Sequence, residues 1–243
     1  AILPVHVYGH PCDVDEIEKI AKKNNLKVLY DAAHAFGVNC HCGSILNHGD
    51  LSVISFHATK VFNTFEGGAI ICKDLKTKEY IDKLKNFGFS DENTVIQVGI
   101  NGKMSEFNAA LGLLQLKHID DAIERRKCID LAYRVSIDKI HGIICLEDTG
   151  EYRKNYSYFP IIIQADYALT RDELYEFLKT NGIHSRRYFS PLISDFPMYQ
   201  GLSSANRENL QVAVQAADQI LCLPIYPDLS KSVVNKICQL LTQ

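Results

Sequence analysis

The first 31 residues follow a strand–helix–strand pattern, and this pattern restricts the fold more than any other feature of the sequence. Residues 1–8 and 26–30 are apolar runs typical of buried strands. Between them, residues 13–24 carry apolar side chains at helical spacing, and Asp13 is a suitable N-cap. Two strands joined by one helix run parallel through a right-handed crossover. The pattern therefore predicts an α/β fold with a mostly parallel sheet.

The rest of the chain divides into two stretches of different character. Strands are predicted at 51–56, 69–72, 143–145 and 156–163, and helices at 77–86, 105–117, 120–140, 171–181 and from Ser230. The leucines at positions 111, 114 and 116 are expected to pack in the core. Because the pattern changes within or just after the long helix, we predict a large domain at 1–125 and a smaller C-terminal α/β domain at 126–243.

Composition excludes several classes of function. The net charge is -3, and no basic cluster marks a surface for nucleic acid or for an anionic membrane. No apolar stretch reaches the roughly 18 to 20 residues that a membrane span needs. No signal peptide opens the chain. These observations favour a cytoplasmic protein. The chain begins with Ala1 inside a strand-like run, which predicts a piece of a longer protein.

The eight cysteines do not predict a disulfide framework, because such frameworks belong to short secreted chains. The run Cys40-His41-Cys42 suggests zinc. Against zinc, no second Cys/His pair stands at finger-like spacing, and Cys-His-Cys alone gives poor tetrahedral geometry. We therefore predict reduced thiols and no metal site.

Two residues stand where a ligand of an α/β sheet would bind. Asp31 ends a predicted strand and opens the run Asp-Ala-Ala-His-Ala-Phe-Gly, whose small residues let a flat group approach the backbone. Lys60 follows the next strand in the run Ser-Phe-His-Ala-Thr-Lys at 55–60, just before Glu-Gly-Gly at 66–68. Taken singly, each residue has a structural explanation: a strand-end Asp often caps a turn, and a Lys is usually solvated.

Three ordered blocks together resemble one family. They are residues 31–37, residues 55–68, and the run Gly-Ile-Asn-Gly-Lys-Met-Ser-Glu-Phe-Asn-Ala-Ala at 99–110. All three are similar to the DegT/DnrJ/EryC1/StrS sugar aminotransferases. The resemblance implies the fold of pyridoxal phosphate (PLP) transferases, fold type I. It also implies that roughly a hundred residues of the large domain would precede Ala1.

The resemblance assigns roles to five residues. Lys60 would bind PLP covalently through its amine and then move the proton during amino transfer. Asp31 would pair with the ring nitrogen and keep the ring an electron sink. His34 would lie against the ring, and Ser55 would donate to the cofactor phosphate. Asn101 would reach the same phosphate from the neighbouring subunit, which makes the expected enzyme a homodimer.

The resemblance places substrate contacts less firmly. Lys103 stands where many relatives have Arg. His184, Arg187 and Tyr188 lie in a run with Arg186 whose cationic side chains suit a sugar-nucleotide diphosphate. A solvated basic turn explains that run equally well.

The expected function is transfer of an amino group from glutamate to a keto-sugar nucleotide, with a dTDP-linked keto-6-deoxyhexose as the expected acceptor, for O-antigen or similar surface-glycan synthesis. One alternative is a PLP- or PMP-dependent sugar dehydratase, but such relatives have His in place of the lysine at position 60. The other alternative is a noncatalytic, dimerising module.

Overall fold

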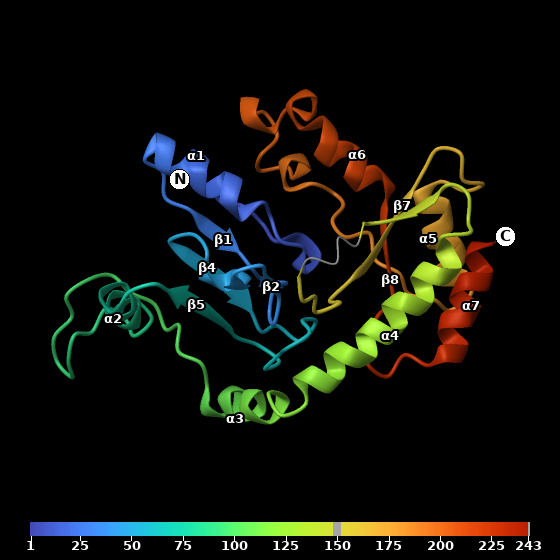
Figure 1. Ribbon diagram of the computed structural model, residues 1–243. Coiled ribbons are helices and arrows are strands. Elements are labelled where there is room, and N and C mark those ends of the chain that lie inside the picture. Colours follow the sequence, from blue (N-terminus) through green and yellow to red (C-terminus); the bar gives the residue numbers. More distant parts are fainter. Residues whose placement is uncertain (148–151, 243) are drawn as a thin grey trace. The chain divides into compact units, whose positions relative to one another are not determined.

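The computed structural model describes residues 1–147 and 152–242, which form two compact units (Figure 1). Within that range, unit 1 contains residues 1–123 and 152–157, and unit 2 contains residues 124–147 and 158–242. The predicted domains 1–125 and 126–243 stay a prediction. In the part of the chain that is described, no helix is both long and apolar enough to cross a membrane.

Unit 1 is built on a three-stranded sheet in the order β1-β4-β5. These strands are β1 (Leu29–Asp31), β4 (Leu51–Ser55) and β5 (Gly68–Cys72). The first two are parallel, as predicted, and β5 is antiparallel to β4. A two-stranded hairpin of β2 (Asn39–Cys40) and β3 (Gly43–Ser44) lies between β1 and β4 in the sequence.

The predicted strand at 1–8 is confirmed in its direction but not in its continuity or burial. The segment runs parallel to β1 through the bridges Ile2–Val28 and Val5–Asp31. The Ile2 and His6 amides donate to the Lys27 and Asp31 carbonyls, and the Leu29 and Asp31 amides donate to the Ile2 and Pro4 carbonyls. Pro4 has no N–H, so the pairing is interrupted there. Leu3 is 65% exposed and Val7–Gly9 form a 3-10 turn, so the segment is not a buried strand through residue 8.

Three helices belong to unit 1: α1 (Val14–Asn24), α2 (Leu75–Leu84) and α3 (Glu106–Gln115). Asp13 caps α1 as predicted, since its carboxylate accepts a hydrogen bond from the Glu16 amide. The expected core packing of α3 is wrong in part. Leu114 is 56% and Leu116 is 49% exposed, because the buried side of α3 is narrow and carries Gly112.

Unit 2 is an antiparallel sheet covered by helices. Its elements are β6 (Ile143–Cys145), β7 (Phe159–Ile163), β8 (Ile220–Leu223), α5 (Arg171–Thr180), α6 (Gln211–Gln219) and α7 (Lys231–Leu241), together with most of α4 (Ile119–Ile137). The strand order is β6-β7-β8. Sequence patterns missed α6 and β8. They found α5, where Thr170 and Glu173 form a capping box.

Candidate active site

Asp31 and Lys60, the two residues singled out in the sequence, follow strands that end at the same edge of the sheet of unit 1. Strands β1 and β4 are parallel, with Asp31 opposite Val53, so their carboxyl ends point the same way. Asp31 ends β1, and its carboxylate accepts a hydrogen bond from the Ala33 amide at 3.0 Å. The loop that carries Lys60 begins directly after β4. The topology therefore brings both residues to the edge where ligands of α/β sheets bind.

The loop at 56–67 is closed at its base by backbone hydrogen bonds. The Phe56 amide donates to the Gly67 carbonyl, and the Thr64 amide donates to the Phe56 carbonyl, both at 2.9 Å. Within the loop, the Lys60 amide donates to the His57 carbonyl at 2.9 Å. Pairing at the base limits how far the Lys60 backbone can move relative to β4.

Aromatic packing and one amide side chain also hold this loop in place. The Phe62 ring is buried, stacks on Phe36 at 4.4 Å and meets the edge of Phe56 at 4.9 Å. The Asn108 amide of α3 donates to the Thr64 and Glu66 carbonyls, each at 2.7 Å. These contacts fix the scaffold around a reactive side chain, as a positioned amine requires.

Asp31, His34 and Lys60 interact electrostatically. Burial lowers the pKa of His34 to about 4, the Lys60 charge adds to this shift, and Asp31 opposes it. Burial also lowers the pKa of the Lys60 ammonium, again with Asp31 acting in opposition. The His34 Nδ1 accepts a hydrogen bond from the Tyr8 amide at 3.1 Å. His34 is thus a neutral imidazole at physiological pH, beside an amine that loses its proton more readily than an ordinary lysine.

Ser55 lies at the end of β4, next to this group. Its hydroxyl oxygen accepts a hydrogen bond from the His57 amide at 3.3 Å, which leaves the hydroxyl hydrogen able to donate to a ligand. The His57 ring is itself turned toward Thr59, with Nδ1 2.9 Å from Oγ1. His57 and Thr59 shape the turn that presents Lys60.

Asn101 and Lys103 lie in another part of unit 1. Asn101 is exposed and forms an isolated bridge with Asn86. The Lys103 amine donates to the Asn86 side chain at 3.0 Å and lies 4.4 Å from the Phe87 ring centre. Both residues line a cavity of about 770 Å³ formed by β5, α2 and the start of α3. The described lining of this cavity includes none of Asp31, His34 and Lys60.

The predicted substrate residues His184, Arg187 and Tyr188 belong to unit 2. His184 is exposed. The Arg187 guanidinium pairs with Asp172 at 2.8 Å and lies 4.3 Å from the Tyr175 ring centre. Tyr188 packs against Tyr158 and Phe189. Arg187 is therefore already paired within its own unit.

One cluster was missed by the sequence argument. Cys40, Cys42 and His48 place their ligand atoms within 4.8 Å of one another. The argument against a metal rested on the lack of a further ligand near the two cysteines. The hairpin brings His48 to them from six residues downstream. A signal was present: Gly43 and the short apolar run after it favour a tight reversal of the chain.

The fold is that of known sugar aminotransferases, and comparison with known proteins identifies the family. The model of the DegT/DnrJ/EryC1/StrS aminotransferase family matches residues 1–242, and the chain belongs to this family. Aminotransferases of this family depend on PLP.

The relatives support the assignment to this family along the whole chain. This chain is 51% identical over 237 residues to a dTDP-4-amino-4,6-dideoxy-D-glucose transaminase of Shigella dysenteriae, and 53% identical over 244 residues to one of Escherichia coli. These matches cover 98% and 99% of this chain, and 64% and 65% of the two relatives. The crystal structure of DesI in the presence of its TDP-sugar product superposes with a TM-score of 0.89 at 33% identity, over 100% of this chain and 61% of DesI.

Proposed function

We propose that the protein carrying this chain is a PLP-dependent nucleotide-sugar aminotransferase, with Lys60 and Asp31 as its catalytic residues. The observation that supports this most directly is the electrostatic group of Asp31, His34 and Lys60 at one sheet edge. An amine with a lowered pKa and a carboxylate of opposite charge are the two groups that a PLP site requires.

The residues present fit the cofactor. Asp31 supplies an anion for the protonated ring nitrogen, and Ser55 has a hydroxyl hydrogen to donate to the phosphate. Ala32 and Ala35 are fully buried in the core of unit 1, so the turn that follows Asp31 is held firmly in place. When bound, PLP supplies an electron sink that stabilises negative charge on the substrate carbon.

Lys60 does the proton chemistry in this proposal. With PLP bound, its amine would hold the cofactor covalently, and an incoming amino group would replace it on the cofactor. The freed amine would then carry a proton from the substrate carbon to the cofactor carbon that bears the nitrogen. The pKa lowered by burial favours the neutral amine that this step needs. His34 is neutral and hydrogen-bonded to the Tyr8 amide, so it would lie against the PLP ring without adding charge.

The acceptor is proposed from the named relatives. Both transaminases of Shigella and Escherichia are named for dTDP-4-amino-4,6-dideoxy-D-glucose, so we propose a dTDP-linked 4-keto-6-deoxyglucose as acceptor. Glutamate is proposed as donor from the family resemblance. Among the alternatives, a sugar dehydratase would have His where this chain has Lys60.

The protein is also proposed to be a homodimer in which Asn101 completes the partner's cofactor site. Asn101 lies within an exposed apolar surface, with neighbouring Val98 92%, Ile100 69% and Phe107 74% exposed. Leu113 and Leu114 extend this surface along α3. An apolar surface of this kind suits a second copy of the chain. The cavity that Asn101 lines lacks the catalytic residues of its own subunit, which supports action across an interface.

The remaining parts of the proposal concern substrate contacts and setting. Lys103, His184, Arg187 and Tyr188 are proposed to bind the sugar nucleotide. For Arg187 this role requires the ion pair with Asp172 to open or to include the ligand. A cytoplasmic location and a role in O-antigen or similar surface-polysaccharide synthesis rest on the family alone.

The experiment is to replace Lys60 by Ala and measure amino-sugar formation by mass spectrometry, with glutamate and the dTDP-linked ketosugar. We expect turnover to fall by about 10³-fold or more, because the proton carrier is removed. In the wild-type protein, borohydride should fix the cofactor to the peptide that contains Lys60. Lys139→Ala, which changes an exposed lysine of unit 2, is the control. Full activity in Lys60→Ala, or an unlabelled wild type without turnover, refutes the proposal and favours the noncatalytic module.

The dimer is tested by mixing inactive subunits. Lys60→Ala and Asn101→Ala subunits are purified, mixed, dissociated and reassociated. If Asn101 acts across the interface, each hybrid dimer has one intact site, and random mixing restores about a quarter of wild-type activity. If Asn101 acts within its own subunit, every site keeps one defect and mixing restores nothing.

A further inference from the structure

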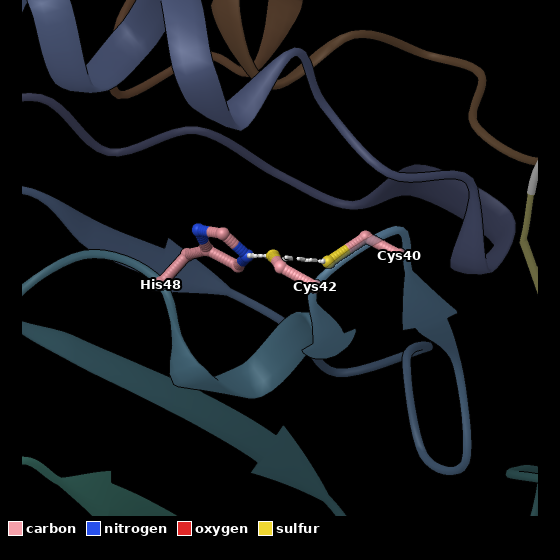
Figure 2. Close-up of side chains that lie close together, drawn as sticks. All are labelled: Cys40, Cys42 and His48. Atoms are coloured by element: carbon pink, nitrogen blue, oxygen red, sulfur yellow. Dashed lines mark hydrogen bonds between the residues drawn. The ribbon is translucent and has the colours of Figure 1, made fainter.

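We propose that Cys40, Cys42 and His48 form a zinc-binding site in unit 1, separate from the residues assigned to PLP. Figure 2 shows the three side chains directed toward one another. The two sulfurs are 3.1 Å apart, and His48 Nε2 lies 3.3 Å from the Cys40 sulfur and 3.2 Å from the Cys42 sulfur. Two thiols and one imidazole are ligands that zinc prefers.

The local fold assembles this cluster without a metal. Strands β2 and β3 pair Cys40 with Gly43, so the loop between them carries Cys42 back beside Cys40. Gly43 has φ of 114°, a conformation that favours glycine. Ile45 then anchors the following 3-10 turn, because its side chain is fully buried. That turn returns the chain so that His48 faces both sulfurs.

The observed separations need little change to hold zinc. With Zn–S near 2.3 Å and Zn–N near 2.0 Å, tetrahedral ligand atoms lie about 3.8 Å (S to S) and about 3.5 Å (S to N) apart. The present distances are shorter by about 0.2 to 0.7 Å, which small side-chain rotations can supply. A disulfide fits the cluster less well, because it leaves no role for an imidazole placed almost equally far from both sulfurs.

The charges also balance. Binding of Zn²⁺ releases one proton from each thiol to solvent, so the two thiolates neutralise the ion and His48 binds as a neutral ligand. Cys42 is exposed, which leaves the fourth position open to water. The Asp15 carboxylate adds negative charge nearby, with Oδ2 3.8 Å from His41 Nε2. A bound ion would therefore link the β2–β3 hairpin to the segment that leads into β4.

His48 gives this tie a structural consequence. Its carbonyl accepts a hydrogen bond from the Ser52 hydroxyl of β4 at 3.3 Å. The next residue, Gly49, packs so closely that an added Cβ would lie 2.8 Å from the Tyr30 ring of β1. A metal fixed on His48 would therefore hold the hairpin against both parallel strands. We expect zinc to stabilise unit 1 and not to be required for amino transfer itself.

The test uses the whole protein that carries this chain, purified under reducing conditions without chelator. Zinc is measured by elemental mass spectrometry after equilibration with Zn²⁺ and gel filtration. We expect about one ion per chain in the wild type. Cys42→Ser and His48→Gln should bind less than about a tenth as much, because each removes one of three ligands. The matched controls His41→Gln and Cys128→Ser change an exposed histidine and an exposed cysteine outside the cluster, and should bind as the wild type does.

Two further measurements keep the proposal open to refutation if a variant folds poorly. Loading wild-type protein with Co²⁺ should give thiolate-to-cobalt charge-transfer absorption and the visible bands of a tetrahedral site. Adding a chelator should lower the Tm of the zinc-loaded wild type and leave that of Cys42→Ser unchanged. Wild-type protein that binds no Zn²⁺ and gives no cobalt spectrum refutes the site. A Cys40–Cys42 disulfide that persists in the reduced preparation refutes zinc as its occupant.

Discussion

Unit 2 encloses its own hydrophobic core, whereas unit 1 leaves much of its apolar surface uncovered. The core of unit 2 draws fully buried side chains from five elements, α4, α5, α7, β7 and β8, including Tyr133, Phe159, Leu174 and Leu221. Unit 1 has a smaller cluster between α1 and the start of the sheet. Its other apolar residues, on β4, β5, α3 and the segment before α3, are largely exposed: Val53, Ile70, Val98, Ile100, Phe107, Leu113 and Leu114.

The difference shows where each unit obtains its stability. Burial of apolar surface is the main favourable term in folding, so unit 2 is stabilised from within. Unit 1 carries the proposed catalytic residues Asp31 and Lys60, together with the cysteine–histidine cluster. Because the chain spans 64% and 65% of the two relatives' lengths, the apolar surface of unit 1 is available to the rest of the protein as well as to a second subunit.

The largest expected effect compares one leucine from each unit. Leu174→Ala should lower the free energy of unfolding by about 2 to 5 kcal/mol, because it leaves a cavity in the core of unit 2. Leu114→Ala, on the exposed side of α3, should change the unfolding of dilute protein by less than about 0.5 kcal/mol. Urea denaturation followed by circular dichroism measures both.

The same pair distinguishes folding from association. If a second copy covers α3, Leu114→Ala should weaken dimerisation in sedimentation equilibrium while Leu174→Ala, corrected for its folded fraction, should not. Equal losses of unfolding free energy in dilute protein would contradict the comparison between the units.

Local signals in the sequence predicted most of the elements and much of the candidate site. Asp13, Ser105 and Thr170 each cap the helix that the pattern placed after them. Asp31 and Lys60 were placed at strand ends because parallel strands share an edge, and the structure has β1 and β4 parallel. These features depend on a few neighbouring residues, and so they can be recognised in a linear sequence.

Features that depend on distant partners could not be predicted. Arg126 is a charged residue of the long helix, yet it is buried and donates to the Ile225 carbonyl, 99 residues away. Burial lowers its pKa to about 10. The exposure of Leu114 likewise depends on what packs against α3. His48 is only six residues from Cys42, and Gly43 signals the reversal between them, but the 3-10 turn that brings His48 to the sulfurs depends on the burial of Ile45 in the core.

A smaller effect concerns pH and tests the electrostatics of unit 1. Because the pKa of His34 is lowered from 6.5 to about 4, the folded state disfavours its protonation. The unfolded chain takes up this proton first, so stability is complete above pH 6.5 and falls as the pH drops toward 4. The loss attributable to His34 is at most about 3 kcal/mol. Urea unfolding of the PLP-free protein at a series of pH values measures it.

The control for this prediction keeps the hydrogen bond and removes the titration. In His34→Asn, the side-chain oxygen can accept from the Tyr8 amide, so this variant should lose less stability between pH 6.5 and 4 than the wild type. His118→Gln, at an exposed position, should follow the wild type. If His34→Asn and the wild type show the same pH dependence, His34 is not the group responsible.

The smallest effect compares the caps of one helix from each unit. Thr170 accepts from the Glu173 amide while the Glu173 carboxylate accepts from the Thr170 amide, so α5 begins with a complete capping box. In α1, the Asp13 carboxylate accepts a hydrogen bond from the Glu16 amide, which is one of the two hydrogen bonds of a capping box.

Thr170→Ala and Asp13→Ala should each cost about 1 kcal/mol, with the larger loss at Thr170 because both hydrogen bonds depend on that residue's geometry. Thr170→Ser and Asp13→Asn, which keep a side-chain acceptor, should restore most of the loss in urea denaturation. Because α5 covers the core of unit 2, its fraying should also speed amide exchange in β8, which α5 contacts. Fraying of α1 should leave β8 unaffected. Faster exchange of β8 in Asp13→Ala would mean that the two units do not unfold independently. The units would then differ in how much apolar surface they expose, and not in how they are stabilised.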